Sequence, residues 1–430
     1  MGQIYSEPVK MEPTLGYVGI KLREPNTICL LHAPREVIAA TESVIKEIFR
    51  KTGEPTRPVE KSDVYGSWGY SLGSHNCFQL ESNKVAAISG RLFTILMLEE
   101  MHKLGYDPVV SSDLSQRFDK TTWIFVKTTS ERPSKKVVGL APDKRDIVMM
   151  VGACNRFQDV VRTSVTEAWP LGIQQEENIE VCGELILQIK LNGNPWWDYE
   201  GEEKHTRCRQ MLIQIMGQLG YNNFRLLFTT NLKGGTDSYF FIHDKYYVID
   251  PSKLAMISLN RKDRMRLINC RDMAESIRRA IIRNGNEIES EEDVYGSWEF
   301  KLSGKPWKSC GAEAVRSKRL ICRVSEKMLD HGWTLTNALD ISRSVSEKTV
   351  LLYSRSESFV TQFACIDLSY HKILRLLDFP QSVTSELKEL IAWEYVPGIK
   401  REQQTDESCY EFYLRGGAWS GESPFNLHSR

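Results

Sequence analysis

A hexapeptide that occurs twice constrains the fold of this chain more than any other feature. Residues 63–68 read DVYGSW, and the same six residues recur at 293–298, where they open the stretch Asp293–Trp307. A degenerate copy runs from Val181 to Trp196, and a fourth lies at Cys409–Trp419. Similar segments that return along a chain predict repeated structural units, each folded in the same way.

The period of the repeat is that of a small domain. Gly105, Gly220 and Gly332 each follow a predicted helix and precede an aromatic residue, about 110–115 residues apart. We expect all three to end their helices as left-handed C-cap residues. Solenoid repeats have periods of roughly 20–50 residues, so this chain is a tandem array of domain-sized units instead.

Hydrophobic periodicity predicts single helices separated by groups of short strands. The predicted helices are 35–50, 92–104, 157–169, 207–219, 271–283, 318–330 and 382–393. The predicted strands are 16–22, 27–32, 64–72, 108–112, 121–127, 137–140, 146–151, 185–191, 225–229, 239–243, 246–249, 255–259, 298–302, 338–342, 349–353, 363–368, 372–377 and 411–414. Each unit of about 110 residues thus reads strand, helix, four strands, helix. This order predicts an α+β fold, with an antiparallel sheet covered on one face by two helices.

The repeats predict the domain organisation up to a choice of phase. We predict a flexible N-terminal segment, three repeat units and a partial fourth unit, at residues 1–14, 15–130, 131–244, 245–360 and 361–430. In the other phase, each unit begins at the strand of the repeated hexapeptide, and partial units remain at both ends. The repeat pattern is compatible with both.

Composition excludes some classes of function. The 430 residues contain 56 Lys and Arg and 56 Asp and Glu, so the net charge is zero, and nucleic acid is not an expected partner. The ten cysteines form no C-x-x-C pair and indicate reduced thiols rather than a disulfide framework. No metal-binding, phosphate-binding or nucleophile motif occurs, so we expect neither a metal nor a cofactor. No apolar run reaches the roughly 20 residues that span a bilayer, and we expect a cytoplasmic protein.

The N-terminus matches the pattern for lipidation. Residues 1–6 read MGQIYS, which fits the M-G-x-x-x-[ST] pattern for myristoylation of Gly2. The pattern is short enough to occur by coincidence. One acyl chain gives marginal membrane binding, so a lasting tether at the cytoplasmic face of a membrane needs a second signal.

The aromatic turn G-x-P-W is the sharpest repeated feature. It occurs at Gly193–Trp196 and Gly304–Trp307, and in relaxed form at Gly416–Trp419. One interpretation is a turn whose tryptophan covers the end of its own sheet. The other is an exposed aromatic group that inserts into a partner, which the adjacent pair Trp196 and Trp197 favours. The candidate partner-binding aromatic residues are therefore Trp196, Trp197, Trp307 and Trp419.

One local basic concentration adds four candidates. Residues 261–266 read RKDRMR, and Arg261, Lys262, Arg264 and Arg266 could contact an acidic partner or anionic lipid. The alternative is a solvated strand end.

Two aligned turns carry the residue types of a catalytic site. Asp113-Leu114-Ser115 and Asp340-Ile341-Ser342 are each followed by an arginine and a Lys-Thr pair. Asp and Ser also cap turns through hydrogen bonds to the backbone, which gives both segments a purely structural interpretation.

Three functional hypotheses follow. The first is a non-catalytic adaptor or scaffold of tandem α+β domains, with protein partners and a membrane tether through Gly2, because linked modules bind by avidity. The second is a small-ligand or lipid-binding protein with an apolar pocket under the sheet. The third is an enzyme whose site lies between units and uses Asp113 or Asp340; a cleft with several perturbed pKa values would distinguish it.

Overall fold

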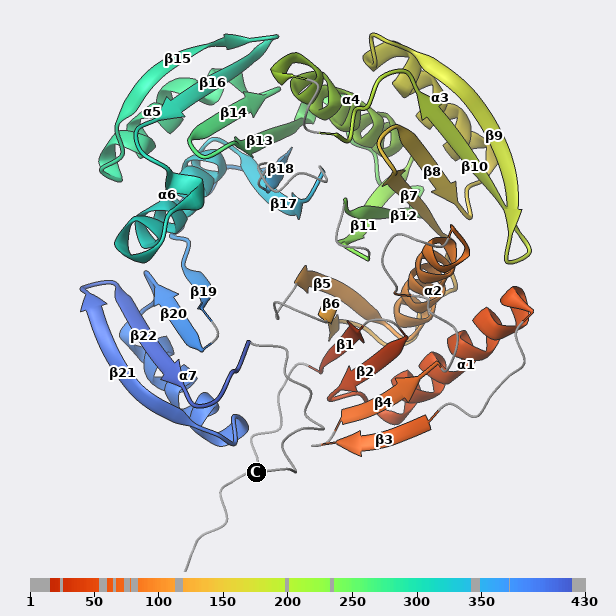
Figure 1. Cartoon of the computed structure of the whole chain (residues 1–430), viewed down its shortest axis with the longest axis horizontal. Coiled ribbons are helices and arrows are strands. Elements are labelled where there is room, and N and C mark those ends of the chain that lie inside the picture. The colour runs from red at the N-terminus through yellow and green to blue at the C-terminus, as the bar shows by residue number, and fades with distance from the viewer. Residues whose placement is uncertain are drawn as a thin grey trace, which may run out of the picture.

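The computed structural model of the chain is a ring of four units that follow one another in sequence order (Figure 1). It describes residues 16–23, 26–53, 60–64, 67–72, 78, 84–112, 119–197, 201–232, 236–341, 349–370 and 372–419. Each unit is built on one antiparallel sheet, and the first and last units form the two ends of the ring.

Unit 1 shows the pattern that the next two units repeat. Its elements are β1 (Tyr17–Arg23), β2 (Thr27–Leu31), α1 (Arg35–Thr52), β3 (Glu60–Val64), β4 (Ser67–Ser71), α2 (Lys84–Lys103), β5 (Tyr106–Ser112) and β6 (Asp119–Lys127). The six strands lie in the order β3-β4-β2-β1-β6-β5. Val18, Ile20 and Leu22 are buried and alternate with less buried residues, the period of two that a strand with one well-packed face requires.

Units 2 and 3 have the same strand order. Unit 2 consists of β7 (Val137–Asp143), β8 (Ile147–Val151), α3 (Asn155–Ala168), β9 (Ile173–Val181), β10 (Glu184–Leu191), α4 (Glu202–Tyr221), β11 (Phe224–Thr230) and β12 (Ser238–His243). Unit 3 consists of β13 (Leu254–Asn260), β14 (Arg264–Ile268), α5 (Ala274–Arg283), β15 (Ile288–Val294), β16 (Ser297–Leu302), α6 (Gly311–Asp330), β17 (Trp333–Leu339) and β18 (Val350–Arg355). The described residues of these units also form the short 3-10 helices η2 (Pro251–Lys253), η3 (Arg271–Met273) and η4 (Pro306–Lys308).

Unit 4 contains the first half of this pattern among the residues that the structure describes. Its elements are β19 (Cys365–Ser369), β20 (Ile373–Leu377), α7 (Gln381–Glu394), β21 (Ile399–Asp406) and β22 (Cys409–Leu414). The four strands lie in the order β19-β20-β22-β21, which matches β1-β2-β4-β3 of unit 1. Counterparts of α2, β5 and β6 are not among the described elements of this unit.

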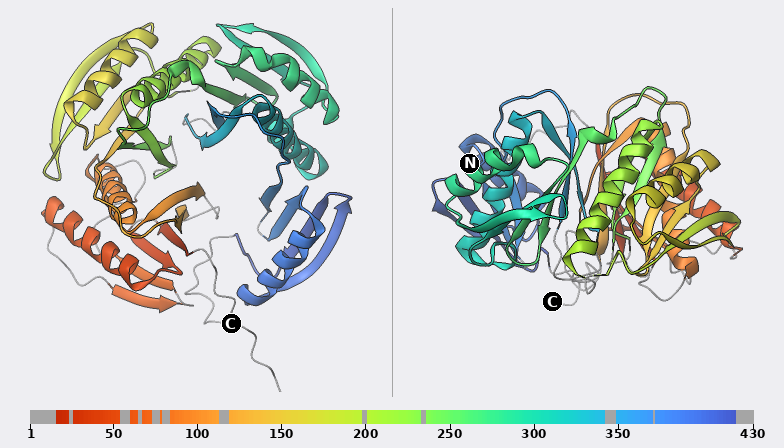
Figure 2. Two further views of the ribbon diagram at one scale, coloured as in Figure 1. Left: turned by 180° about the vertical axis from the view of Figure 1, so that it is seen from behind. Right: turned by 90° about the horizontal axis from the view of Figure 1, so that it is seen from above.

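The second helix of each complete unit joins that unit to the next (Figures 1 and 2). Ile88 and Leu92 of α2 share one buried apolar cluster with Met149 of unit 2. Leu212 of α4 shares another with Met256 of unit 3. Apolar contact is therefore continuous across both boundaries, and burial of this surface is the main force that holds units 1–3 in one ring.

The predicted α+β class, with tandem units and antiparallel sheets, is confirmed. The predicted order of elements missed the outermost strand of every unit: β3, β9, β15 and β21. β15 has the sequence IESEEDV and is exposed along most of its length. A sheet-edge strand with both faces near water lacks the alternation that reveals a strand, which explains the omission.

Gly220 does not end its helix as predicted. It lies inside α4, which continues to Tyr221, and the left-handed residue before β11 is Asn223, with φ 68°. Asn is the residue after glycine that best tolerates this conformation. Glycine is required at position 220 by packing, because a Cβ atom there would collide with the side chain of Ile249. Gly105 and Gly332 do have positive φ, as predicted.

Candidate functional site

The tryptophans of the G-x-P-W turns cover their own sheets. Trp196 is 1% exposed, and its indole N–H donates a 3.0 Å hydrogen bond to the carbonyl of Ile147. Trp307 is partly buried and donates in the same way to Arg264, at 2.9 Å. Trp419 is also partly buried and packs against the apolar cluster of unit 4. Of the two interpretations, the exposed indole is therefore wrong for Trp196, because burial and one hydrogen bond fix its side chain at the start of β8.

Trp197 lies beside Trp196 but points elsewhere. It is half-buried, and the guanidinium of Arg145 lies over its ring, 4.1 Å from the centroid. Two adjacent tryptophans thus separate into a core residue and a cation–π partner, and the pair forms no joint aromatic surface.

The basic stretch 261–266 is a strand boundary rather than a uniformly solvated surface. Arg264 and Arg266 belong to β14, where both pair with the buried carboxylate of Glu299 on β16. Arg266 is 1% exposed. β14 was not predicted because its arginines resemble surface residues, although both are paired with Glu299. The prediction of a strand at residues 246–249 is wrong, because these residues lie between β12 and η2.

The outer end of this stretch is accessible. Arg261 and Lys262 are exposed, and Arg261 forms an ion pair with Glu202 at 2.6 Å. Of the other two members of the predicted basic patch, Arg266 is buried and Arg264 is partly buried, and both are paired with Glu299.

Asp340 takes part in a joint between units 2 and 3. Its backbone N–H donates to the carboxylate of Asp237 at 2.7 Å, and the N–H of Asp237 donates to the Asp340 carbonyl at 2.8 Å. Burial raises the pKa of Asp237 to about 7. Asp113, Ser115, Ser342 and Gly2 lie outside the described residues.

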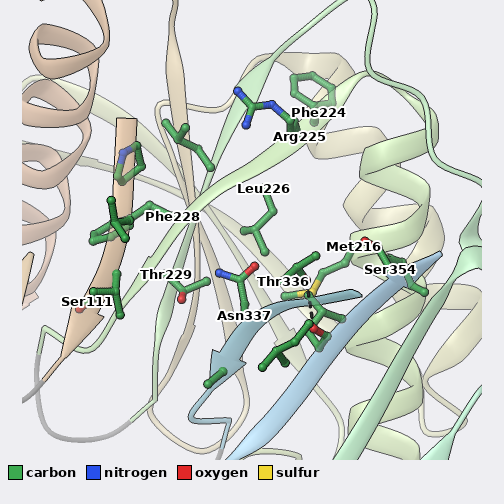
Figure 3. A pocket seen from close by; sticks show the side chains of 18 of the residues that line it. Ser111, Met216, Phe224, Arg225, Leu226, Phe228, Thr229, Thr336, Asn337 and Ser354 are labelled. Atoms are coloured by element: carbon green, nitrogen blue, oxygen red, sulfur yellow. Dashed lines mark hydrogen bonds between the residues drawn. The ribbon is translucent and has the colours of Figure 1, made fainter. Parts of the chain in front are cut away.

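Three strands from three different units line one cavity at the ring axis. β5, β11 and β17 are the terminal strands of their sheets, and together they line a cavity of about 550 Å³ (Figure 3). Binding sites for small molecules are commonly about 300–1,000 Å³ and often lie between domains. The cavity is at the axis and not under a sheet, where the second functional hypothesis placed it; the space lined by Ile45, Phe49 and Phe93 under sheet 1 has no room for a water-sized molecule.

Each of these strands carries a β-bulge at the same position. The extra residues are Val109 in β5, Leu227 in β11 and Thr336 in β17. Each lies four residues after the left-handed residue that precedes its strand, and all three line the cavity. A bulge bends a strand and turns its side chains, so the shape of this cavity is a property of the repeat.

The cavity wall mixes apolar and polar groups. Val109 and Val110 are 56% and 43% exposed. Among the described lining residues Arg225 alone is charged, and its guanidinium lies 3.8 Å from the carboxylate of Asp244. Asn337 and Thr229 lie on opposite strands of the wall. Apolar contact together with a few polar groups suits an elongated amphipathic ligand.

Hydroxyl groups close the side of the cavity where β5 meets β11. Ser111 donates to the hydroxyl of Thr230 at 2.8 Å, and the indole of Trp123 donates to the same oxygen at 2.9 Å. These bonds join unit 1 to unit 2 and hold two walls of the cavity at a fixed separation. The sequence predicted most of β5 and β11 but only the last two residues of β17. The meeting of the three strands was not predicted, because only the ring geometry brings them together.

The fold defines a class of protein: a ring of tandem α+β units. One domain-family model matches the chain four times, at residues 17–126, 136–245, 253–354 and 362–430. The matches cover most of the chain, which therefore belongs to this domain family and carries four tandem copies of its domain. No curated protein and no solved structure matches the chain significantly.

No described helix is both long and apolar enough to cross a membrane. No group of three or more potential metal ligands occurs in the part of the chain that the structure describes.

Proposed function

We propose that the protein is a non-catalytic adaptor that binds an extended peptide segment of a protein partner in the cavity at the ring axis. The observation that supports this proposal is that one cavity is lined jointly by the bulged terminal strands of three units. A terminal strand has one backbone edge that its own sheet does not pair, and extended peptides bind such edges through main-chain hydrogen bonds. Side chains such as Val110, Leu226 and Asn337 would then select the sequence that binds.

The test uses peptides selected from a displayed random library on the full-length protein. Their dissociation constants are measured for the wild type, for Val110→Trp and Leu227→Trp, which fill the cavity, and for the control Leu185→Trp. Leu185 is 63% exposed on β10 and is not among the lining residues. We expect the cavity variants to weaken binding about tenfold or more. The proposal fails if every selected peptide binds the cavity variants as tightly as the control.

A small amphipathic ligand is the second candidate for this cavity. The observation that favours it is the position of Arg225, a cation at the edge of an otherwise uncharged wall. The probe is the fluorescent anion anilinonaphthalene sulfonate. Binding to wild type that is lost in both Arg225→Met and Leu227→Trp would support this candidate, and equal fluorescence in all three proteins would reject it.

The membrane tether through Gly2 belongs to the same proposal. Its support is the match of residues 1–6 to the myristoylation pattern. Intact mass and fractionation of the native protein, beside Gly2→Ala, test it. We expect loss of Met1, gain of a myristoyl group, and departure of the variant from the membrane fraction; an unmodified N-terminus would remove the tether.

A further inference from the structure

Unit 4 exposes a strand position that the other three units bury. In each unit a residue with positive φ precedes the first helix. Ile366 in β19 lies as many positions before that residue as Ile20, Leu140 and Ile257 do in their own units, so the four positions are equivalent. Those three residues are 0–1% exposed, whereas Ile366 is 54% exposed. In units 1–3 the first strand is an inner strand of a six-stranded sheet, and a second helix accompanies it.

The helix of unit 4 likewise exposes a position that is buried in unit 1. In α1 the residues at three successive turns, Ala40, Val44 and Ile48, are buried, and α2 packs along this helix. The residue of α7 equivalent to Val44 is Leu390, which is 54% exposed. α7 packs on its own sheet through Leu387 and Ile391, and Thr384 is the one residue of the described helix that is buried. Leu390 lies on the face of the helix that this packing leaves exposed.

β19 also has an unpaired edge within the described part of the sheet. In units 1–3 this edge of the first strand pairs antiparallel with the last strand, as β1 pairs with β6 and β13 with β18. In unit 4 the described sheet ends at β19. An unpaired edge beside exposed apolar side chains is a surface that takes up another strand.

Charge indicates what kind of helix fits beside it. Leu390 has a glutamate one turn before it and one turn after it, Glu386 and Glu394, both exposed. In α1 the equivalent residues are the apolar Ala40 and Ile48. A helix that covers Leu390 therefore meets negative charge on both sides, and basic residues at its flanks would complement it.

We infer that unit 4 is a docking surface for a partner protein that adds an antiparallel strand to β19 and lays an amphipathic helix with basic flanks along α7. The surface continues the interface that α6 already makes with β19. The complete units show the geometry of the occupant, because a helix followed by a strand pair completes each of them. None of Ile366, Glu386 and Leu390 is among the lining residues of the axial cavity, so this interface is independent of the proposed peptide site.

The probe for this surface comes from the chain itself. A synthetic peptide of residues 311–355 carries α6, β17 and β18, the elements that complete unit 3, and α6 contains Arg316, Lys318, Arg319, Arg323 and Lys327. Its binding to the full-length protein is followed by fluorescence anisotropy. We expect saturable binding that Ile366→Lys and Leu390→Lys each weaken about tenfold or more. Binding should also weaken at high salt, because the glutamates contribute to it.

The matched control is Ile282→Lys. Ile282 is 58% exposed on α5, the counterpart of α7 in unit 3, so this substitution makes the same chemical change on an equivalent helix. It should leave peptide binding unchanged. Both substituted positions in unit 4 are more than half exposed, and circular dichroism spectra that match the wild type would show that the variants fold.

Four outcomes would overturn the inference. The first is no saturable binding, and the second is an equal effect of Ile282→Lys. The third is a wild-type dimer in sedimentation that Leu390→Lys dissociates, which would assign the surface to a second copy of the chain. The fourth is peptide binding by a chain ending at residue 419 but not by the full chain, which would assign the surface to residues 420–430.

Discussion

The junction between units 2 and 3 and the junction between units 3 and 4 are made by equivalent helices, but different forces hold them. At the first junction, α4 shares a large buried apolar cluster with both units. At the second, the apolar cluster that bridges α6 and unit 4 is small, and charge supplies most of the contact. The ion pairs there are Lys318–Asp367 at 2.9 Å, Arg319–Asp406 at 2.7 Å and Arg323–Asp378 at 2.9 Å.

The junction between units 3 and 4 is also less tightly packed. The second junction contains a cavity of about 390 Å³ lined by Arg319, Arg375 and Glu411, among others. Apolar burial contributes about 25 cal/mol per Å² and is not screened by salt, whereas partly exposed ion pairs contribute about 0–1 kcal/mol each and are screened. We therefore expect units 1–3 to unfold as one cooperative body and unit 4 to open separately.

The largest expected effect comes from removing an aromatic contact between units 1 and 2. Phe228 is 4% exposed, and its ring centroid lies 5.8 Å from that of Trp123 and 6.1 Å from that of Phe125. Phe228→Ala should lower the free energy of unfolding of units 1–3 by about 3–5 kcal/mol. Guanidinium unfolding followed by tryptophan fluorescence measures this loss. Phe412→Ala, in the core of unit 4, is the matched change and should affect unit 4 alone.

Removing a buried carboxylate should have a comparable or slightly smaller effect. Glu299 neutralises Arg264 and Arg266, and its equivalent in unit 4, Glu411, pairs with Arg375. Glu299→Ala leaves two arginines without this partner and should cost about 3–5 kcal/mol. Glu411→Ala should destabilise only unit 4. Hydrogen exchange resolved by peptide distinguishes the two results, and identical exchange profiles for both variants would contradict the division of the ring.

Asp237 gives the joint between units 2 and 3 a dependence on pH. Burial raises its pKa to about 7, above the unfolded value of about 3.9. Between these values the folded chain keeps a proton that the unfolded chain releases, so this group makes stability fall as pH rises from about 4 to about 7. Asp237→Asn should remove that fall. At pH 8 the free energy of unfolding of this variant should exceed that of the wild type by on the order of 3 kcal/mol. Unfolding curves at pH 5 and pH 8 test this, and parallel pH profiles for the two proteins would count against it.

The smallest effect is expected at the charged junction. Arg319 contacts Asp378 and Asp406, and its side chain is 20% exposed. Arg319→Met should lower the free energy of opening of unit 4 by about 1 kcal/mol and reduce its salt dependence. Hydrogen exchange of residues 365–414 measures both. A loss spread evenly over all four units would show that this junction is not separate.

The class of fold could be predicted from the sequence because repeated patterns reinforce one another. The apolar stripes of helices such as α1 and α3 and the apolar run of β8 are local signals, and each predicted its element. The outer strands were not predicted because exposed edges carry no alternation, and β14 was not predicted because its ion-paired arginines look like surface residues. Asn223 replaced glycine at a helix end, which hid the true boundary of α4.

The candidate sites were harder to predict because they depend on how units are placed. Val109, Leu227 and Thr336 are far apart in sequence, differ in residue type, and meet only when the ring forms. The exposure of Ile366 was equally hidden, because an apolar residue occupies the same strand position in the units where it is buried. Of the two interpretations of Trp307, its hydrogen bond to Arg264 favours the one in which the tryptophan covers its own sheet. The arrangement of units decides which surfaces remain open.

Hydrogen exchange of the full-length protein at low and at high salt shows whether unit 4 opens separately from units 1–3. We expect residues 365–414 to exchange through an opening with a smaller free energy than the rest of the ring, and high salt to accelerate exchange in this region alone. One common free energy of opening for all four units, unchanged by salt, would contradict it.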